Sequence, residues 1–158
     1  MTENELREIV KRTLSSLKTD KSVMTLDLAE KICEAVMGYA RKAGVNAVVC
    51  ISDAAGNPKL VKSMDDAYIA SYDVAVNKAF TVVALKMSTS TLKPLAQPGQ
   101  SLYGIQFTNG GRIVIFGGGE PLIGDGGKII GGLGVSGGSE AQDTLLAKQG
   151  KEFFEALK

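Results

Sequence analysis

Apolar residues spaced three and four positions apart predict four helices along the chain. The first, residues 5–17, carries an apolar stripe opposite a face of Glu, Arg and Lys. The second runs from Thr25, its expected N-cap, to about Lys42, and Gly44 is its expected stop. The other two helices are expected at residues 66–86 and 140–157. The stripe of the first helix consists of Leu6, Ile9, Val10, Thr13, Leu14 and Leu17.

The remaining apolar segments are short and bounded by turn residues, which is typical of strands. An apolar, β-branched run at 45–53 and a returning run at 59–64 predict a hairpin. Three further strands are expected as a meander at 112–117, 121–124 and 128–135. The inward face of the third helix is expected to consist of Ile69, Tyr72, Val76, Phe80 and Val83. Helices and five antiparallel strands predict an α+β domain.

The last helix begins with a clear signal, since Ser139 and Gln142 match a capping box. Residues 88–111 form a long irregular connection, a kind of segment that often carries function. We expect three parts in the chain: an amphipathic helix at 1–18, a linker at 19–24 and one domain at 25–158. A chain of 158 residues is long enough to bury a proper core.

Composition narrows the classes of partner. Eighteen basic and seventeen acidic residues leave a net charge of +1, without a long basic run, so nucleic acid is not an expected partner. No apolar run reaches the length of a membrane span, and the charged start does not fit a secretory signal, so we expect a soluble, cytoplasmic protein. Cys33 and Cys50 each sit in an apolar stretch, as buried free thiols do.

Residues 132–138, GLGVSGG, match two catalytic patterns at once. G-x-G-x-x-G opens a dinucleotide-binding unit, but the chain ends before a further strand can follow. G-x-S-x-G places Ser136 at a nucleophile elbow, but the chain has no histidine to act as its base. Two interpretations therefore stay open: the glycines allow close packing and a sharp turn, or they border a small-ligand site at a helix N-terminus.

The order of the elements and several motifs resemble one family. The motifs are VVCISDAAGNP, KSMDDA, AVNKAFTVVAL and FGGGEPLIGDGGKIIGGLGVSGGSEAQD. Over residues 25–158 they are similar to the GlcG/HbpS-like family, which includes the C-terminal domain of PduO-type proteins. The resemblance implies a profilin-like fold with a five-stranded antiparallel sheet and helices on both faces. It also implies a homo-oligomer, commonly an octamer, and haem binding in some members.

The same resemblance maps recurrent family positions onto this chain. Asp53 and Gly56 are expected turn-formers in the first hairpin. The expected cofactor-binding positions are Asp65, Lys78, Gly118, Gly119, Pro121, Ser136, Gly137 and Gly138. Gly134 and Asp143 complete the family positions, and no metal site is expected. An arginine common in the family is replaced by Ser63, and Lys62 lies next to it.

Since the chain has no histidine, another side chain would have to provide any axial contact to haem iron. The candidates are Tyr68, Tyr103 and Met64, each of which also fits a packing role. Lys78, on a helix of apolar neighbours, is either a surface lysine or a cation at a cleft. In a cleft it would pair with Asp65, Asp143 or a ligand carboxylate, and burial would lower its pKa.

The leading functional hypothesis is an oligomer that binds a small molecule, with a tetrapyrrole such as haem or a corrinoid as the first ligand class. Ligand carboxylates would meet Lys78 and the N–H groups near Ser136 to Gly138. One alternative is an enzyme for a small carboxylated or phosphorylated metabolite, with Lys78 and Asp143 as acid and base. A structural cargo protein is another.

The first helix resembles the encapsulation peptides of bacterial microcompartments, so residues 1–18 are a candidate contact to a compartment shell. That helix would otherwise pack on its own domain or across an oligomer interface. Its mixed charges and its lack of Trp and Phe do not favour a membrane surface.

Overall fold

The computed structural model describes residues 2–16 and 18–158, and the side chains of Lys11 and of residues 14–16 are also outside the description. Leu14 and Leu17 of the predicted apolar stripe therefore lie outside the described side chains. The helices are α1 (Glu3–Ser16), α2 (Leu26–Ala43), α3 (Ile69–Leu85), α4 (Thr89–Leu95) and α5 (Glu140–Ala156). The strands are β1 (Val48–Asp53), β2 (Pro58–Ser63), β3 (Gly119–Ile123) and β4 (Ile129–Ser136).

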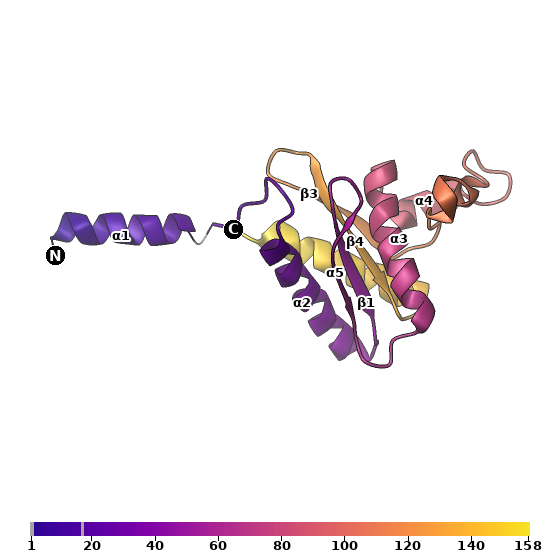
Figure 1. Ribbon diagram of the computed structural model, residues 1–158, viewed down its shortest axis with the longest axis horizontal. Coiled ribbons are helices and arrows are strands. Elements are labelled where there is room, and N and C mark those ends of the chain that lie inside the picture. The colour runs from indigo at the N-terminus through magenta and orange to yellow at the C-terminus, as the bar shows by residue number, and fades with distance from the viewer. Residues whose placement is uncertain (1, 17) are drawn as a thin grey trace.

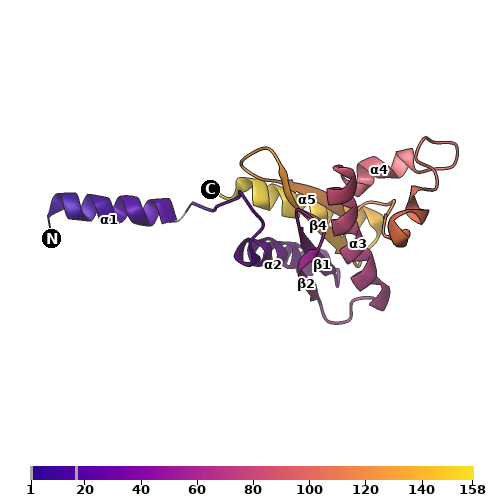
Figure 2. The same ribbon diagram turned by 45° about the horizontal axis from the view of Figure 1, so that its top comes forward.

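The fold is α+β, as the sequence predicts, with the strands in the order β2-β1-β4-β3 and every pair antiparallel. Helices α2 and α5 pack together on one face of the sheet, and α3 covers the other face (Figures 1 and 2). Buried β1 serves both layers, since Val49 and Ile51 join the α2/α5 core while Val48 and Cys50 pack against α3. The period of two along a strand produces this division.

The described residues form four strands, so the expected count of five is wrong. The segment expected as a strand at 112–117 lies against α3 instead. The N–H of Val114 donates to Thr81 Oγ1 at 3.0 Å, and that hydroxyl shares its proton between the carbonyls of Asn77, at 2.7 Å, and Arg112, at 3.3 Å. A side chain of α3 therefore takes the backbone bonds that a neighbouring strand would have taken.

The third helix differs from the expectation in its start and in its buried face. Asp66 adopts a left-handed backbone with φ of 61°, so α3 begins only at Ile69. Ile69 is 98% exposed and Tyr72 is also exposed, although both were expected to point inward. The face on the sheet consists of smaller residues, Ala75 and Ala79 among them, which let α3 approach β4 closely.

The predicted helix caps are confirmed. The Thr25 side chain accepts the N–H of Leu28, and Gly44 ends α2 in a left-handed conformation. Ser139 and Gln142 form a reciprocal capping box at the start of α5. The long connection at 88–111 contains α4 and two 3-10 turns, Ile105–Phe107 and Asn109–Gly111. Local chemistry sets all of these caps.

Both cysteines are buried and free, as expected. Burial raises the pKa of the Cys33 thiol to about 11 and that of Cys50 to about 12. Thiols with such pKa values are almost entirely protonated at neutral pH, so they are poor nucleophiles. Within the described part of the chain, no helix is long and apolar enough to cross a membrane.

Candidate functional site

Lys78 is fully buried between α3, β4 and α5, which excludes the surface-lysine interpretation. Its Nζ donates to the carbonyl of Val135 at 2.7 Å and to Asp143 Oδ2 at 3.2 Å. The Phe116 ring lies over the ammonium, with its centroid 5.1 Å from Nζ. Two acceptors and an aromatic face therefore replace the water that an exposed lysine would bind.

Asp143 links this lysine to the start of α5. Its second oxygen, Oδ1, accepts the N–H of Gly138 at 2.8 Å. The predicted pairing of Lys78 with Asp143 is thus present in the fold. Desolvation lowers the pKa of Lys78, as the sequence predicted, and the charge of Asp143 opposes that shift only in part.

The GG-x-P turn packs directly around the lysine. Gly118 has a left-handed φ of 114°, and a Cβ there would lie 2.6 Å from Lys78 Nζ. Gly119 donates its N–H to Thr89 Oγ1 at 2.9 Å. Pro121 lies on β3, an edge strand of the described sheet, where proline is tolerated because one side needs no N–H. Gly118 therefore leaves room for the Lys78 side chain, and Gly119 lets β3 approach α3 and Thr89.

Ser136 is not arranged as a nucleophile. It is buried at the end of β4, and its hydroxyl donates to Ser71 Oγ at 3.1 Å. Gly132 and Gly134 of the same motif face α3, where a Cβ would meet backbone oxygens of Ala79 and Ala75. The close-packing interpretation of the glycine-rich stretch accounts for these contacts.

A polar cavity of about 450 Å³ lies at the end of the sheet where β4 meets α5. Its lining includes Asn46, Asp66, Tyr68, Gly137, Gly138 and Gln142. The N–H of Gly138 is held by Asp143, and the N–H of Ser139 is held by the Gln142 side chain at 2.9 Å. Protein groups thus satisfy the Gly138 N–H, which was expected to face a ligand, and the neighbouring Ser139 N–H.

The chain matches a family model over residues 24–152, that of the haem degrading protein HbpS-like family. The chain belongs to the HbpS-like family. It is 45% identical, over 136 residues, to a 15.0 kDa protein from the dhaT-dhaS intergenic region of Citrobacter freundii. That match covers 86% of this chain and 95% of the relative.

Two further similarities concern PduO. The corrinoid adenosyltransferase PduO of Salmonella typhimurium is 38% identical over 151 residues, covering 92% of this chain and 45% of PduO. This HbpS-like chain therefore spans less than half the length of that relative. The solved PduOC:heme complex is similar with a TM-score of 0.79 and 37% identity, covering 83% of this chain and 94% of the solved chain.

Other positions implied by the HbpS-like resemblance lie apart from the lysine. Asp65 is exposed in the turn between β2 and α3. Asp53 Oδ1 accepts the N–H groups of Ala55 and Asn57, and Gly56 has a left-handed φ of 79°. Asp53 and Gly56 thus form the hairpin turn, as expected.

The three candidate axial residues differ in exposure. Met64 packs against the α2/α5 core, and its sulfur accepts the N–H of Ala47 at 3.4 Å. Tyr68 is 72% exposed at the start of α3, and Tyr103 is 62% exposed in the long connection. Of these three candidates in the HbpS-like chain, the two tyrosines are exposed, whereas Met64 is half-buried.

Some site residues were not identified from the sequence. Phe116 covers Lys78, Ser71 pairs with Ser136, and Asn46 lines the polar cavity. Ser71 and Asn46 belong to no recognisable local motif, and Phe116 opens the FGGGEP motif without being identified there as a site residue. They reach the site through contacts between distant segments, for which one sequence carries no signal.

Proposed function

We propose that this HbpS-like protein binds a tetrapyrrole, haem or a corrinoid, as a homo-oligomer, and that the homo-oligomer is an octamer, as the family resemblance implies. One observation carries the proposal: Tyr68, Ile69 and Tyr72 expose a cluster of large apolar side chains at the start of α3, and Tyr68 also lines the polar cavity. Exposed apolar clusters of this kind mark binding surfaces. The family description and the similarity to the PduOC:heme complex support the same ligand class.

The residues present suit such a ligand. A flat macrocycle would lie on the exposed cluster, and its polar substituents would reach the cavity, where Asn46 and Gln142 carry amide donors and Asp66 carries acceptor oxygens. The Tyr68 phenol would contact the metal, because a tyrosine oxygen can ligate haem iron and the chain contains no histidine. When bound, the metal would supply ligand-exchange and redox chemistry.

Lys78 and Asp143 act as positioning residues in this proposal. Both are buried, and neither lines the polar cavity. Their ion pair holds α3, which carries the exposed cluster, against the first turn of α5, which borders the cavity. Moving either helix would separate the two halves of the site. An acid–base role for the pair would require access that the observed packing does not provide.

The test is a titration of the purified protein with haemin, followed at the Soret band, with cobalamin as a second ligand. We expect a saturable spectral change, and Tyr68→Phe should weaken haemin binding about tenfold, equal to about 1.4 kcal/mol. Tyr103→Phe is the matched control, since this tyrosine is also exposed but lies on the long connection.

The expected result is a loss confined to the Tyr68 variant. If only cobalamin binds saturably, the ligand is still a tetrapyrrole, but it is a corrinoid and not haem. Unsaturable spectra with both ligands, or identical losses in both tyrosine variants, would overturn the proposed site.

We also propose that residues 1–18 associate with a bacterial microcompartment, in whose interior the protein would reside within the cytoplasm. The supporting observation is that α1 exposes Leu6, Ile9 and Val10 on one stripe. The family match begins only at residue 24, so the helix is an addition to the matched domain. An added amphipathic helix with an uncovered stripe is suited to bind a partner protein.

Fusing residues 1–20 to a fluorescent protein tests this association in cells that build such compartments. We expect discrete foci, and the substitution Ile9→Glu should disperse them because it places a charge on the apolar stripe. Glu8→Gln, on the polar side, is the control that should keep the foci. Diffuse fluorescence from the unaltered fusion would contradict a targeting role.

A further inference from the structure

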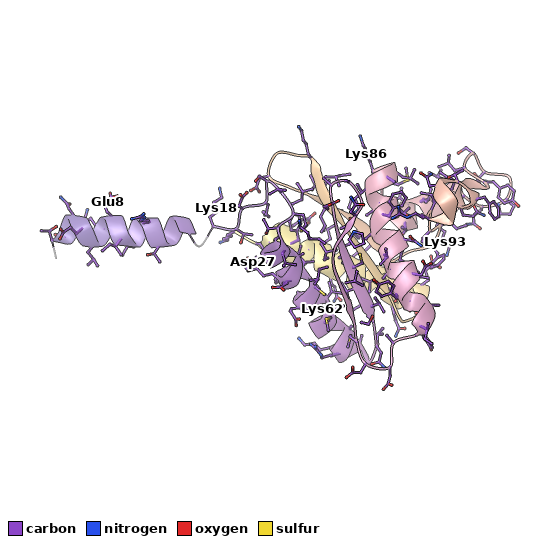
Figure 3. All side chains as sticks on the ribbon, in the orientation of Figure 1. Glu8, Lys18, Asp27, Lys62, Lys86 and Lys93 are labelled. Atoms are coloured by element: carbon purple, nitrogen blue, oxygen red, sulfur yellow. The ribbon has the colours of Figure 1, made fainter. Side chains whose placement is uncertain are left out.

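The apolar stripe of helix α1 is exposed in the single chain. Leu6, Ile9 and Val10 follow the helical spacing and are all exposed. In two views α1 stands apart from the rest of the chain (Figures 1 and 2), and Figure 3 shows Glu8 on this separate helix. Such a stripe is stabilised by packing against an apolar surface.

Hydrogen bonds hold the linker that follows α1, residues 19–24, against the C-terminal end of α5. The N–H of Thr19 donates to the carbonyl of Lys158 at 2.6 Å. Lys21 Nζ donates to the carbonyl of Leu157 at 2.8 Å and lies 5.5 Å from the centroid of the Phe154 ring. Because the last carbonyls of a helix attract cations, Lys21 holds the linker there. The C-terminal end of α1 is therefore held next to the C-terminal end of α5.

Two separate hollows along α2 and α5 together form a surface long enough to hold a helix. Two hollows lie between these helices, of about 260 Å³ and about 530 Å³. Leu145, Gln149 and Phe153 line it from α5 at steps of four residues, and Ala35 and Tyr39 line it from α2 with the same step. We call the surface formed by these five residues the α2/α5 groove. Leu145 is an exposed apolar residue within it.

We infer that the α2/α5 groove binds α1 of a second copy of this chain. With a rise of about 1.5 Å per residue, α1 is about 21 Å long, whereas the step from Leu145 to Phe153 covers about 12 Å. One helix therefore spans both hollows. The stripe of Leu6, Ile9 and Val10 supplies the apolar anchors that helix-in-groove binding requires.

Charge selects the direction of the bound helix. The hollow near Phe153 is bordered by three acidic residues and one basic residue of α2, and the other hollow is bordered by Lys42. The four charged residues near Phe153 are Asp27, Glu30, Lys31 and Glu34. In α1 the acidic residue Glu5 lies in the first turn, and Arg12 lies toward the other end. An α1 helix parallel to α5 places each of these charges near its opposite.

A second copy is the favoured occupant because α1 points away from its own domain, with its base fastened at the end of α5 (Figure 2). Two copies related by a twofold axis can exchange their helices, and each exchange buries one stripe in one groove. The same stripe would face a compartment shell, so shell binding and helix exchange would compete. The inference does not depend on the tetrapyrrole proposal.

Disulfide trapping in the full chain tests the exchange. A Leu6→Cys protein is mixed with a Leu145→Cys protein under mild oxidation, and a non-reducing gel reports linked pairs. The native Cys33 and Cys50 are buried and unreactive, so they do not interfere. We expect a linked dimer in the mixture and its loss when Glu8→Cys, on the polar side of α1, replaces Leu6→Cys.

Each other outcome overturns the inference. If the double variant carrying both cysteines forms only an internal link, then α1 occupies the groove of its own chain. A linked dimer that forms equally with Glu8→Cys would show that the link arises from random collision and not from binding of the apolar stripe. Absence of any link removes the groove as the site for α1. Because Leu145 is not part of the 1–20 fusion, failure here is distinguishable from failure of compartment targeting.

Discussion

Replacing Lys78 with methionine is expected to lower the free energy of unfolding by about 3–5 kcal/mol, as is typical when one member of a buried ion pair is removed. Methionine keeps much of the volume, so the loss comes from charge. Asp143 would keep its bond from Gly138 but lose the cation, and the carbonyl of Val135 would lose its donor. Urea unfolding followed by circular dichroism measures the change.

Two control variants distinguish the effect of the unpaired buried charge from a general effect of substitution on stability. Lys93→Met breaks the ion pair between Lys93 and Glu140, in which both side chains are partly exposed. It should lower the free energy of unfolding by about 0–1 kcal/mol. The double variant Lys78→Met with Asp143→Asn removes both charges and keeps an acceptor for Gly138, so it should recover most of the loss. A Lys78→Met protein as stable as Lys93→Met would show that the buried pair contributes little.

Replacing Gly134 with alanine is expected to destabilise the fold by about 3 kcal/mol, at the upper end for overpacking. A Cβ at this position would lie 2.0 Å from the backbone oxygen of Ala75 and 2.8 Å from the backbone nitrogen of Ala79. Both atoms belong to the backbone of α3, so the whole helix would have to move away from β4. Urea unfolding is again the measurement.

Gly38→Ala is the matched control, because it adds the same methyl group elsewhere. No atom lies within 4 Å of a Cβ at Gly38, which is inside α2. Alanine is favoured over glycine in a helix by about 1 kcal/mol, so this variant should be more stable than the parent. Equal effects of the two substitutions would refute the view that Gly134 is needed for close packing of α3.

Local chemistry made several elements predictable. Thr25, Gly44 and the Ser139–Gln142 capping box end or begin helices through bonds to nearby residues, so a short sequence window contains the whole signal. The first hairpin follows from the turn chemistry of Asp53 and Gly56 in the same way. These elements were placed to within a few residues.

Predictions that depended on a partner segment were weaker. The apolar run at 112–117 fits a strand by pattern, but its partner is the Thr81 side chain. The large residues Ile69 and Tyr72 fit an inward face, but glycines on β4 select the alanines of α3 instead. In both cases the neighbour, rather than the segment itself, decides the outcome.

The sequence by itself determined the helix caps, the hairpin turn, the buried thiols and the family. Only the tertiary structure decided how Lys78 is enclosed and which of its candidate partners it meets. The bonds from Lys78 join residues separated by 57 and 65 positions, and two of the cavity residues, Asn46 and Gln142, come from opposite ends of the domain. Contacts over such separations depend on how the layers pack, which no local pattern encodes.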